Sequence, residues 1–217
     1  MSHTWAKARE PISSFTHMLG AVFFTAATLL LVCKTIVVSD WSWQVLAGVI
    51  LFGASLIALY SASSIYHFFN GSVKKLLVLR KLDHAMIYVL IAGTYTPILL
   101  KYLSGAEGWI FTAAIWSCAL VGIVIKLCWF SAPRWLQTVL YIAMGGAMLF
   151  DISIFQSMSG GAIFLLAAGG LSYTIGGVIY MIKRPNISVA FGFHELFHIF
   201  VLLGSLFHFL MIFFYVA

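Results

Sequence analysis

The strongest constraint on the fold of this chain is a series of seven long apolar stretches, separated by short polar breaks. A helix that crosses a lipid bilayer needs about 20 mainly apolar residues, and each stretch reaches that length. A transmembrane β-barrel would instead show strands of alternating polarity, which these stretches lack. The sequence therefore predicts an all-α fold, a bundle of seven transmembrane helices. The predicted spans are Phe15–Val38, Trp43–Phe69, Leu82–Tyr102, Trp109–Phe130, Trp135–Met158, Ala162–Ile182 and Ile187–Val216.

The composition excludes an ordinary soluble domain. Hydrophobic residues make up 63% of the chain and charged residues 8%, whereas soluble domains have about 45–50% and about 25%. So little polar surface cannot cover a water-soluble globule. The breaks between the stretches are short, so we expect residues 1–217 to form a single integral membrane domain.

The lysines and arginines predict the orientation of the bundle, because cytoplasmic loops carry an excess of them. With the N-terminus in the cytoplasm, only Lys34 and Lys101 fall on the outer side. The inner ends and loops then hold Lys7, Arg9, Lys74, Lys75, Arg80, Lys81, Lys126, Arg134, Lys183 and Arg184. Seven spans place the C-terminus outside. The net charge of +6 is thus a topology signal rather than a nucleic-acid footprint, and we expect a multi-pass protein of the inner or plasma membrane.

A few polar residues inside the spans share one layer near the cytoplasmic face in this topology. Ser63 and His67 lie one helical turn apart in the second span, and Asp83 opens the third. His194 and His198 form an i, i+4 pair near the inner end of the seventh. A single intramembrane histidine often only hydrogen-bonds across helices. Here the paired spacing and the shared depth together favour a metal site, since ionisable groups in a span are functional candidates by default.

Histidines in this pattern are typical of catalytic zinc, which takes three protein ligands and keeps its fourth position for water. Zinc can lower the pKa of that water to about 7. A nearby carboxylate can then accept a proton from the water or orient a ligand. The carboxylate candidates are Asp83 and Glu195.

The residues from His194 to His198 also satisfy H-E-x-x-H, in which the glutamate is the general base of a zinc protease. The better-known families of this kind take their third ligand further along the chain. No acidic residue follows Glu195, and His208 lies about 15 Å beyond His198 along the same predicted helix. A third ligand must come from upstream, where His67 is a candidate together with Asp83. The protease interpretation is therefore disfavoured.

Three segments carry a family resemblance: "SSIYHFF" from Ser63 to Phe69, "RKLDHAMIYVLIAGTYTP" from Arg80 to Pro97, and "FHELFHIFVLLGSLFHF" from Phe193 to Phe209. Their pattern is S-x-x-x-H, then D, then H-x-x-x-H. It resembles the bacterial hemolysin III branch of the PAQR (progestin and adipoQ receptor) superfamily, over nearly the full length from Glu10 onward. The resemblance implies seven helices with a cytoplasmic N-terminus.

The resemblance also implies a zinc ion near the cytoplasmic side, bound by His67, His194 and His198. A water completes the coordination in relatives, with the aspartate, here Asp83, hydrogen-bonded to it and the serine, here Ser63, close by. The family does not require a glutamate within H-x-x-x-H, so the resemblance makes the one at 195 incidental.

The segment "EPISSFTH" keeps Glu10, Thr16 and His17 of the N-terminal family motif, but has Ser13 where Asn is common. We interpret this end as a cap and anchor of the inner face rather than as catalytic. His84 is expected to be a neighbour of the site and not a ligand.

Three functions compete. The first is a hydrolase in which Asp83 would act as base, and zinc and Ser63 would stabilise the developing oxyanion. Its substrate would be a lipid amide or ester, by analogy with superfamily members that cleave lipid amides. In a non-enzymatic sensor or regulator of membrane lipid homeostasis, zinc would be structural and would join the second and seventh spans. A pore-forming cytolysin is disfavoured because no polar face runs through the full depth of the spans. The sequence leaves the choice between enzyme and regulator open.

Overall fold

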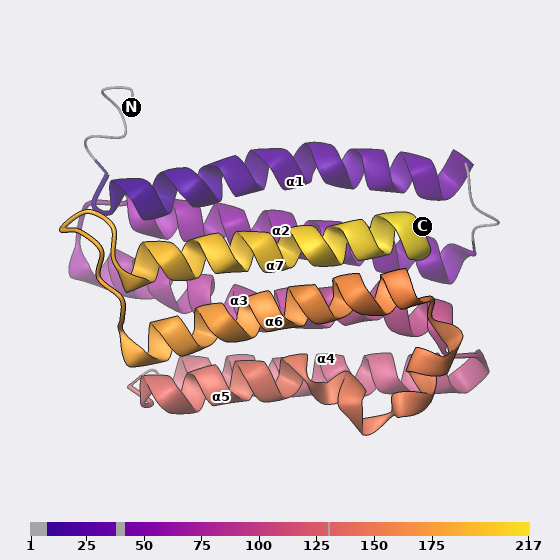
Figure 1. Cartoon of the computed structure of the whole chain (residues 1–217). Coiled ribbons are helices and arrows are strands. Elements are labelled where there is room, and N and C mark those ends of the chain that lie inside the picture. Colours follow the sequence, from indigo (N-terminus) through magenta and orange to yellow (C-terminus); the bar gives the residue numbers. More distant parts are fainter. Residues whose placement is uncertain (1–7, 38–41, 130) are drawn as a thin grey trace.

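The computed structural model describes residues 8–37, 42–129 and 131–217, and all regular structure in these ranges is helical. This confirms the all-α prediction for the part of the chain described. Figure 1 shows the long helices lying side by side along one axis. The elements are α1 (Pro11–Val37), α2 (Trp43–Phe68), α3 (Val73–Tyr102), α4 (Gly105–Cys128), α5 (Arg134–Gly145), the 3-10 helices η2 (Ala147–Phe150) and η3 (Ile152–Ser157), α6 (Gly160–Ile182) and α7 (Phe193–Tyr215).

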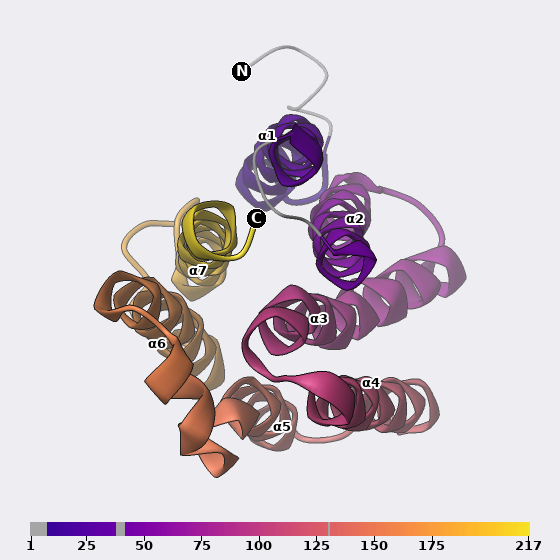
Figure 2. The same ribbon diagram turned by 90° about the vertical axis from the view of Figure 1, so that its right-hand side faces the viewer.

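The helices form a ring in chain order, as the end view in Figure 2 shows. Consecutive helices pack on one another from α1 to α4 and from α5 to α7. The helix α7 closes the ring against α1, and α3 also contacts α5 and α7. This arrangement brings the C-terminal end of α2 and the N-terminal ends of α1, α3, α5 and α7 to one end of the bundle (Figure 1).

Five of the described helices are long and apolar enough to cross a membrane by length and composition, namely α1, α2, α4, α6 and α7. Each coincides with one of the seven predicted spans. The helix α3 is longer than any of them, but Gly93–Pro97 dilutes its apolar part and charged residues lie at both its ends. Two predicted span ends, Val38 and Phe130, fall outside the described residues, as does the basic residue Lys7.

Two helix starts differ from the predicted span boundaries. The helix α3 begins at Val73, well before the predicted Leu82, because the lysines and arginines of its first turns extend a helix without being apolar. The helix α7 begins at Phe193 rather than Ile187, because a turn precedes it in which the N–H groups of residues 187 and 188 donate to the Phe191 carbonyl. Hydropathy locates a membrane core and not the ends of a helix.

The prediction of one continuous helix over Trp135–Met158 was wrong, because α5 ends at Gly145 and is followed by η2 and η3. Two consecutive glycines, which are poor helix formers, stand at this point. The Tyr95 hydroxyl donates to the Gly145 carbonyl over 2.7 Å and accepts from the Met148 N–H over 3.0 Å. One side chain of α3 thus replaces the helical hydrogen bonds that the break removes.

An acidic residue in this region, Asp151, directly precedes η3. Its carboxylate accepts hydrogen bonds from the backbone N–H and the hydroxyl of Ser153, so it caps the first turn of η3. Asx caps of this kind satisfy backbone donors at the start of a helical turn. The residue is partly buried and has a local structural role.

The helix α7 is joined to α1 near both ends. At one end, the Ser13 hydroxyl donates to Glu195 Oε1 over 3.0 Å. At the other, the Lys34 ammonium donates to the carbonyls of Phe213 and Ala217, at 2.5 and 2.6 Å. A cation is favourable beside the unpaired carbonyls at a helix C-terminus. These contacts fix where the first turns of α7 lie, and those turns carry two of the predicted ligands.

Candidate metal centre

Three histidines from two helices converge at one end of the bundle. His67 lies in the last turn of α2, and His194 and His198 lie in the first turns of α7. One ring nitrogen from each lies within 4.8 Å of those of the other two. The Nε2 atoms of His67 and His194 are 3.4 Å apart. His67 and His198 are almost completely buried.

This donor set fits a tetrahedral metal ion. Ligand atoms about 2.0–2.1 Å from a zinc ion in tetrahedral geometry lie about 3.3–3.4 Å from one another. The separation of the Nε2 atoms of His67 and His194 matches that spacing. The ligand atoms of the two pairs that include His198 lie within 4.8 Å of each other and would approach to the same spacing around an ion. The three residues could therefore hold a metal ion.

Glu10 orients the ring of His67. Its carboxylate is hydrogen-bonded to His67 Nδ1, and its backbone N–H donates to the His67 carbonyl over 3.0 Å. With Nδ1 held, Nε2 faces the other two histidines, which is the usual role of a carboxylate behind a metal-binding histidine. The sequence interpretation treated Glu10 only as an anchor of the inner face. The two residues are 57 positions apart, and the family motif was the one signal that singled Glu10 out.

Glu10 is poised to remain a carboxylate. Partial burial alone would raise its pKa, but the hydrogen bond and the charge of His67 lower it, and the nearby Arg9 adds to this effect, so that the pKa lies below its ordinary value. An Arg9 guanidinium nitrogen lies 3.3 Å from Glu10 Oε1. A negative charge on this side chain favours the tautomer of His67 with its proton on Nδ1.

Glu195 caps α7. Its Oε2 accepts the N–H of Gly192 over 2.9 Å in a capping box, and its Oε1 accepts the Ser13 hydroxyl. Among the described residues, Glu195 does not belong to the group of possible ligands. The geometry agrees with the interpretation that the glutamate of H-E-x-x-H is incidental here.

His17 supports the site from α1. Its ring stacks on that of His198, with centroids 3.7 Å apart and planes 11° from parallel. The edge of Tyr60 packs against it at 5.0 Å between centroids. Neither ring nitrogen of His17 has a hydrogen-bond partner among the described residues. The sequence placed His17 in the same layer, but no sequence signal identified this stacking.

Asp83 and Ser63 lie beside the three histidines. The Asp83 carboxylate has the Ser63 hydroxyl and the His84 ring as hydrogen-bond partners. His84 Nδ1 is 3.3 Å from Asp83 Oδ2 and 2.8 Å from the Arg80 carbonyl. In the described chain, Asp83 is not part of the ligand group. The three histidines could supply three of the four ligands of a tetrahedral ion, and Asp83 lines the same cavity as they do.

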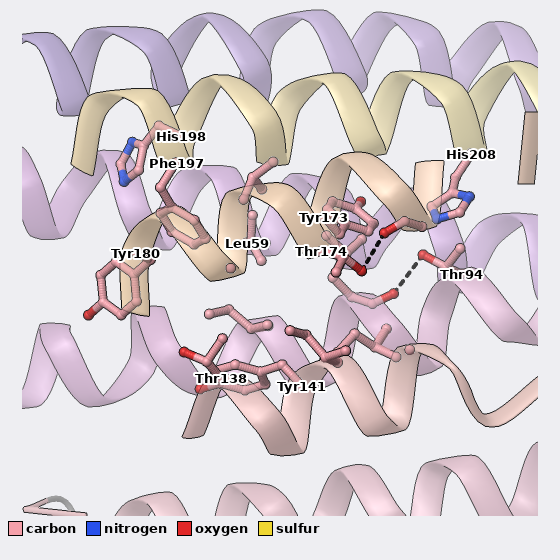
Figure 3. A pocket seen from close by; sticks show the side chains of 18 of the residues that line it. Leu59, Thr94, Thr138, Tyr141, Tyr173, Thr174, Tyr180, Phe197, His198 and His208 are labelled. Carbon is pink, nitrogen blue, oxygen red and sulfur yellow. Dashed lines mark hydrogen bonds between the residues drawn. The ribbon is translucent and has the colours of Figure 1, made fainter. Parts of the chain in front are cut away.

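The histidines border a cavity of about 1180 Å³ inside the bundle. Its walls are mainly apolar side chains of α2, α3, α5, α6 and α7, such as Leu59, Leu90, Ile142, Leu166 and Val201. Asp83 and Ser63 also face this space. Figure 3 shows His198 at one end of the residues drawn and His208 at the other, both on α7. One end of the cavity is thus polar and could hold a metal ion, whereas most of its wall is apolar.

Comparison with known proteins identifies the family. The family model described as "Haemolysin-III related" matches residues 5–209. The chain belongs to the haemolysin-III family. It is 33% identical over 211 residues to Hemolysin-3 of Bacillus cereus, covering 95% of this chain and 91% of that protein. It is 34% identical over 207 residues to the Hemolysin-3 homolog of Bacillus subtilis, covering 95% and 93%.

More distant similarity reaches the PAQR superfamily. The chain is 25% identical over 214 residues to the Adiponectin receptor protein of Drosophila melanogaster, covering 90% of this chain and 48% of that protein. The predicted family resemblance is thus confirmed. Family membership and the five apolar helices make this haemolysin-III protein a multi-pass membrane protein.

Proposed function

We propose that this haemolysin-III family protein is a zinc-dependent hydrolase of lipid amide or ester bonds. The observation that supports this most directly is the convergence of three histidines at the end of a large apolar cavity that Asp83 and Ser63 also line. A structural zinc site would fill all four positions with protein groups, whereas a catalytic one keeps a position open. The arrangement of this site favours catalysis.

In the proposed topology, the protein crosses the membrane seven times. The spans are the five long apolar helices together with α3 and the α5–η3 segment. The N-terminus lies in the cytoplasm, the C-terminus outside, and the histidines near the cytoplasmic face of the cell membrane. The distribution of basic residues supports this orientation, because Arg9, Arg80, Arg134 and Lys183 all lie at helix ends on the side of the histidines. Cytoplasmic ends of spans are enriched in such residues.

In the proposed reaction, His67, His194 and His198 hold the zinc ion. When bound, zinc supplies Lewis acidity and a water of lowered pKa at the open position. Asp83 accepts a proton from the attacking water as general base. Glu10 keeps His67 in the tautomer that can bind metal through Nε2.

Before the reaction, Ser63 holds Asp83 in position, because its hydroxyl is a hydrogen-bond partner of that carboxylate. His84 holds the same carboxylate from the other side, at 3.3 Å. Once Asp83 has taken a proton, the Ser63 hydroxyl can turn toward the substrate and donate to its developing oxyanion. When the carbonyl re-forms and the C–N or C–O bond breaks, Asp83 gives that proton to the leaving amine or alcohol, and the fatty acid is released. The apolar cavity receives the acyl chain of the substrate and excludes water from it.

The alternative function is a non-enzymatic regulator of membrane lipid homeostasis with a structural zinc ion. The observation in its favour is that the ligands come from both α2 and α7, while His17 of α1 stacks on one of them. A metal ion there would join three helices and could transmit the state of the cavity to the bundle. This alternative requires no turnover of the lipid.

The test measures zinc content and turnover in the same purified, detergent-solubilised samples. We expect about one zinc ion per chain in the wild type, the stoichiometry of a three-histidine site, and its loss in His67→Ala. We expect zinc-dependent release of a fatty acid from a fluorescent acyl amide or ester, reduced about 10²–10⁴-fold in Asp83→Asn with zinc retained. Zinc-loaded protein without turnover above background supports the regulator, and wild type without zinc contradicts both functions.

A further inference from the structure

A further buried histidine lies at the far end of the same cavity. His208 follows His198 by ten residues on α7, which is about 15 Å along a helix at 1.5 Å per residue. Its side chain lines the cavity, and the residue is 6% exposed. Figure 3 shows the two rings at opposite ends of the group of lining residues. The cavity therefore has a polar side chain at each end.

The ring of His208 has no hydrogen bond within the described residues. Its Nδ1 is buried without a partner, and no described residue bonds to Nε2. A neutral imidazole carries one N–H donor and one nitrogen acceptor. Buried polar groups are nearly always hydrogen-bonded, and a buried one without a partner calls for a ligand or water to explain it. Packing alone gives no reason for a histidine at this position.

The opposing helix accommodates this ring closely. A Cβ atom at Gly169 of α6 would lie 2.5 Å from His208 Cε1, so no larger residue fits there without displacing the ring. Tyr173 packs against the ring with centroids 5.3 Å apart. The Tyr173 hydroxyl is already bonded to Ser205 over 2.8 Å and leaves His208 unpaired. The imidazole is held in place with Nδ1 enclosed, which leaves Nε2 as the ring nitrogen that can pair with a ligand in the cavity.

The chemistry at this end suits a neutral group. Thr94 lies nearby on the cavity wall (Figure 3), and its hydroxyl donates to the Leu90 carbonyl, so that its oxygen can still accept. The charged residues that line the cavity belong to the histidine-triad end, on or beside the first turns of α1, α3, α5 and α7. They are Glu10, Arg80, Asp83, Arg134 and Glu195. A hydroxyl group, which can both donate and accept, matches the far end better than an ion does.

We propose that His208 recognises a hydroxyl group on the acyl chain of the lipid in the cavity. The inference rests on the proposed function, because it takes the carbonyl of that lipid to lie at the histidine triad. The distance of about 15 Å corresponds to about twelve extended chain bonds, each advancing about 1.2 Å. The preferred ligand therefore carries a hydroxyl near carbon 12, and His208 determines this specificity.

The test compares fatty acids that differ by one hydroxyl, binding to the zinc-loaded full chain in detergent. The probes are octadecanoic acid, 12-hydroxyoctadecanoic acid and 2-hydroxyoctadecanoic acid. One hydrogen bond between neutral groups predicts about 3- to 10-fold tighter binding of the 12-hydroxy acid than of octadecanoic acid. His208→Leu should abolish this preference while still binding octadecanoic acid, and His208→Gln should keep part of it. The 2-hydroxy acid should show no dependence on residue 208.

A matched control is Thr174→Val, which removes another hydroxyl from the cavity lining, one that donates to the Gly170 carbonyl over 2.8 Å. This variant should keep the full preference. Equal binding of the two acids by wild type, or an unchanged preference in His208→Leu, overturns the role of His208 and leaves the proposed function intact. Binding of none of the acids by zinc-loaded wild type overturns the lipid ligand of the proposed function, and this inference with it.

Discussion

The carboxylate of Glu10 binds the Nδ1 side of the His67 ring and so fixes which nitrogen faces the other two histidines. Glu10 precedes α1 and His67 lies in the last turn of α2, so this one hydrogen bond joins two helices at the candidate metal centre. A backbone hydrogen bond joins the same two residues, since the Glu10 N–H donates to the His67 carbonyl. The first helix is therefore part of the site although it supplies no ligand.

Replacement of Glu10 by Gln should weaken zinc binding. The amide cannot accept the Nδ1 proton with the strength of a carboxylate, and loss of such a partner behind a ligand lowers metal affinity about 10- to 100-fold. Competition with a zinc chelator of known affinity measures the change. Glu107→Gln, an exposed change in the first turn of α4, is the control and should have no effect. Equal affinities for Glu10→Gln and wild type would show that the hydrogen bond does not orient His67.

Replacement of Glu195 by Ala should reduce stability and spare the zinc. The variant removes the cap of α7 and the bond from Ser13, and the loss of a cap costs about 0.5–2 kcal/mol. Thermal unfolding in detergent should show a lower midpoint, with about one zinc ion retained per chain. If turnover instead fell more than about 100-fold with zinc retained, Glu195 would be acting as a general base.

The role of His17 can be separated from that of a ligand by two substitutions. His17→Phe keeps a ring against His198 and removes two buried nitrogens that have no partner. We expect this variant to bind zinc normally and to be no less stable than wild type, because unpaired buried polar groups are costly. His17→Ala leaves a cavity beside His198 and should destabilise the protein by about 2–4 kcal/mol. Loss of zinc from His17→Phe would make His17 a ligand.

Removal of the Tyr95 hydroxyl should loosen the break after α5. Tyr95→Phe leaves the Gly145 carbonyl and the Met148 N–H without their shared partner. The expected destabilisation is about 1–3 kcal/mol, mainly the cost of leaving the buried Met148 N–H unpaired. Tyr102→Phe, which removes an exposed hydrogen bond to the Tyr215 carbonyl, is the matched control and should cost less. Equal thermal midpoints for the two variants would contradict a structural role for the Tyr95 hydroxyl.

The sequence was most informative where one local pattern determines the outcome. Continuous apolar runs located α1, α2, α4, α6 and α7 because each helix satisfies its own backbone hydrogen bonds and needs only an apolar surface to lie in lipid. The i, i+4 spacing of His194 and His198 placed two possible ligands on one helix face, because residues four apart are neighbours on a helix. The family resemblance added the third ligand position, on another helix.

The sequence was least informative where side chains from distant helices meet. The end of α5 depends on Tyr95 of α3, and the orientation of His67 depends on Glu10, which lies 57 residues away. Neither pairing leaves a periodic signal in the chain. The glutamate in H-E-x-x-H was ambiguous by motif alone, and only the positions of Gly192 and Ser13 around it assign it to a cap.

Removal of zinc should destabilise the bundle only when all three histidine ligands are present. If the ion joins α2 to α7, its contribution grows with free zinc, by about 2.7 kcal/mol at a concentration 100 times the dissociation constant. A chelator should therefore lower the thermal midpoint of wild type and have little effect on His67→Ala, which lacks a ligand already. An equal shift in both proteins would mean that the chelator acts elsewhere. No shift in zinc-loaded wild type would mean that α2 and α7 are held by packing alone, and that the metal, where bound, serves chemistry rather than the fold.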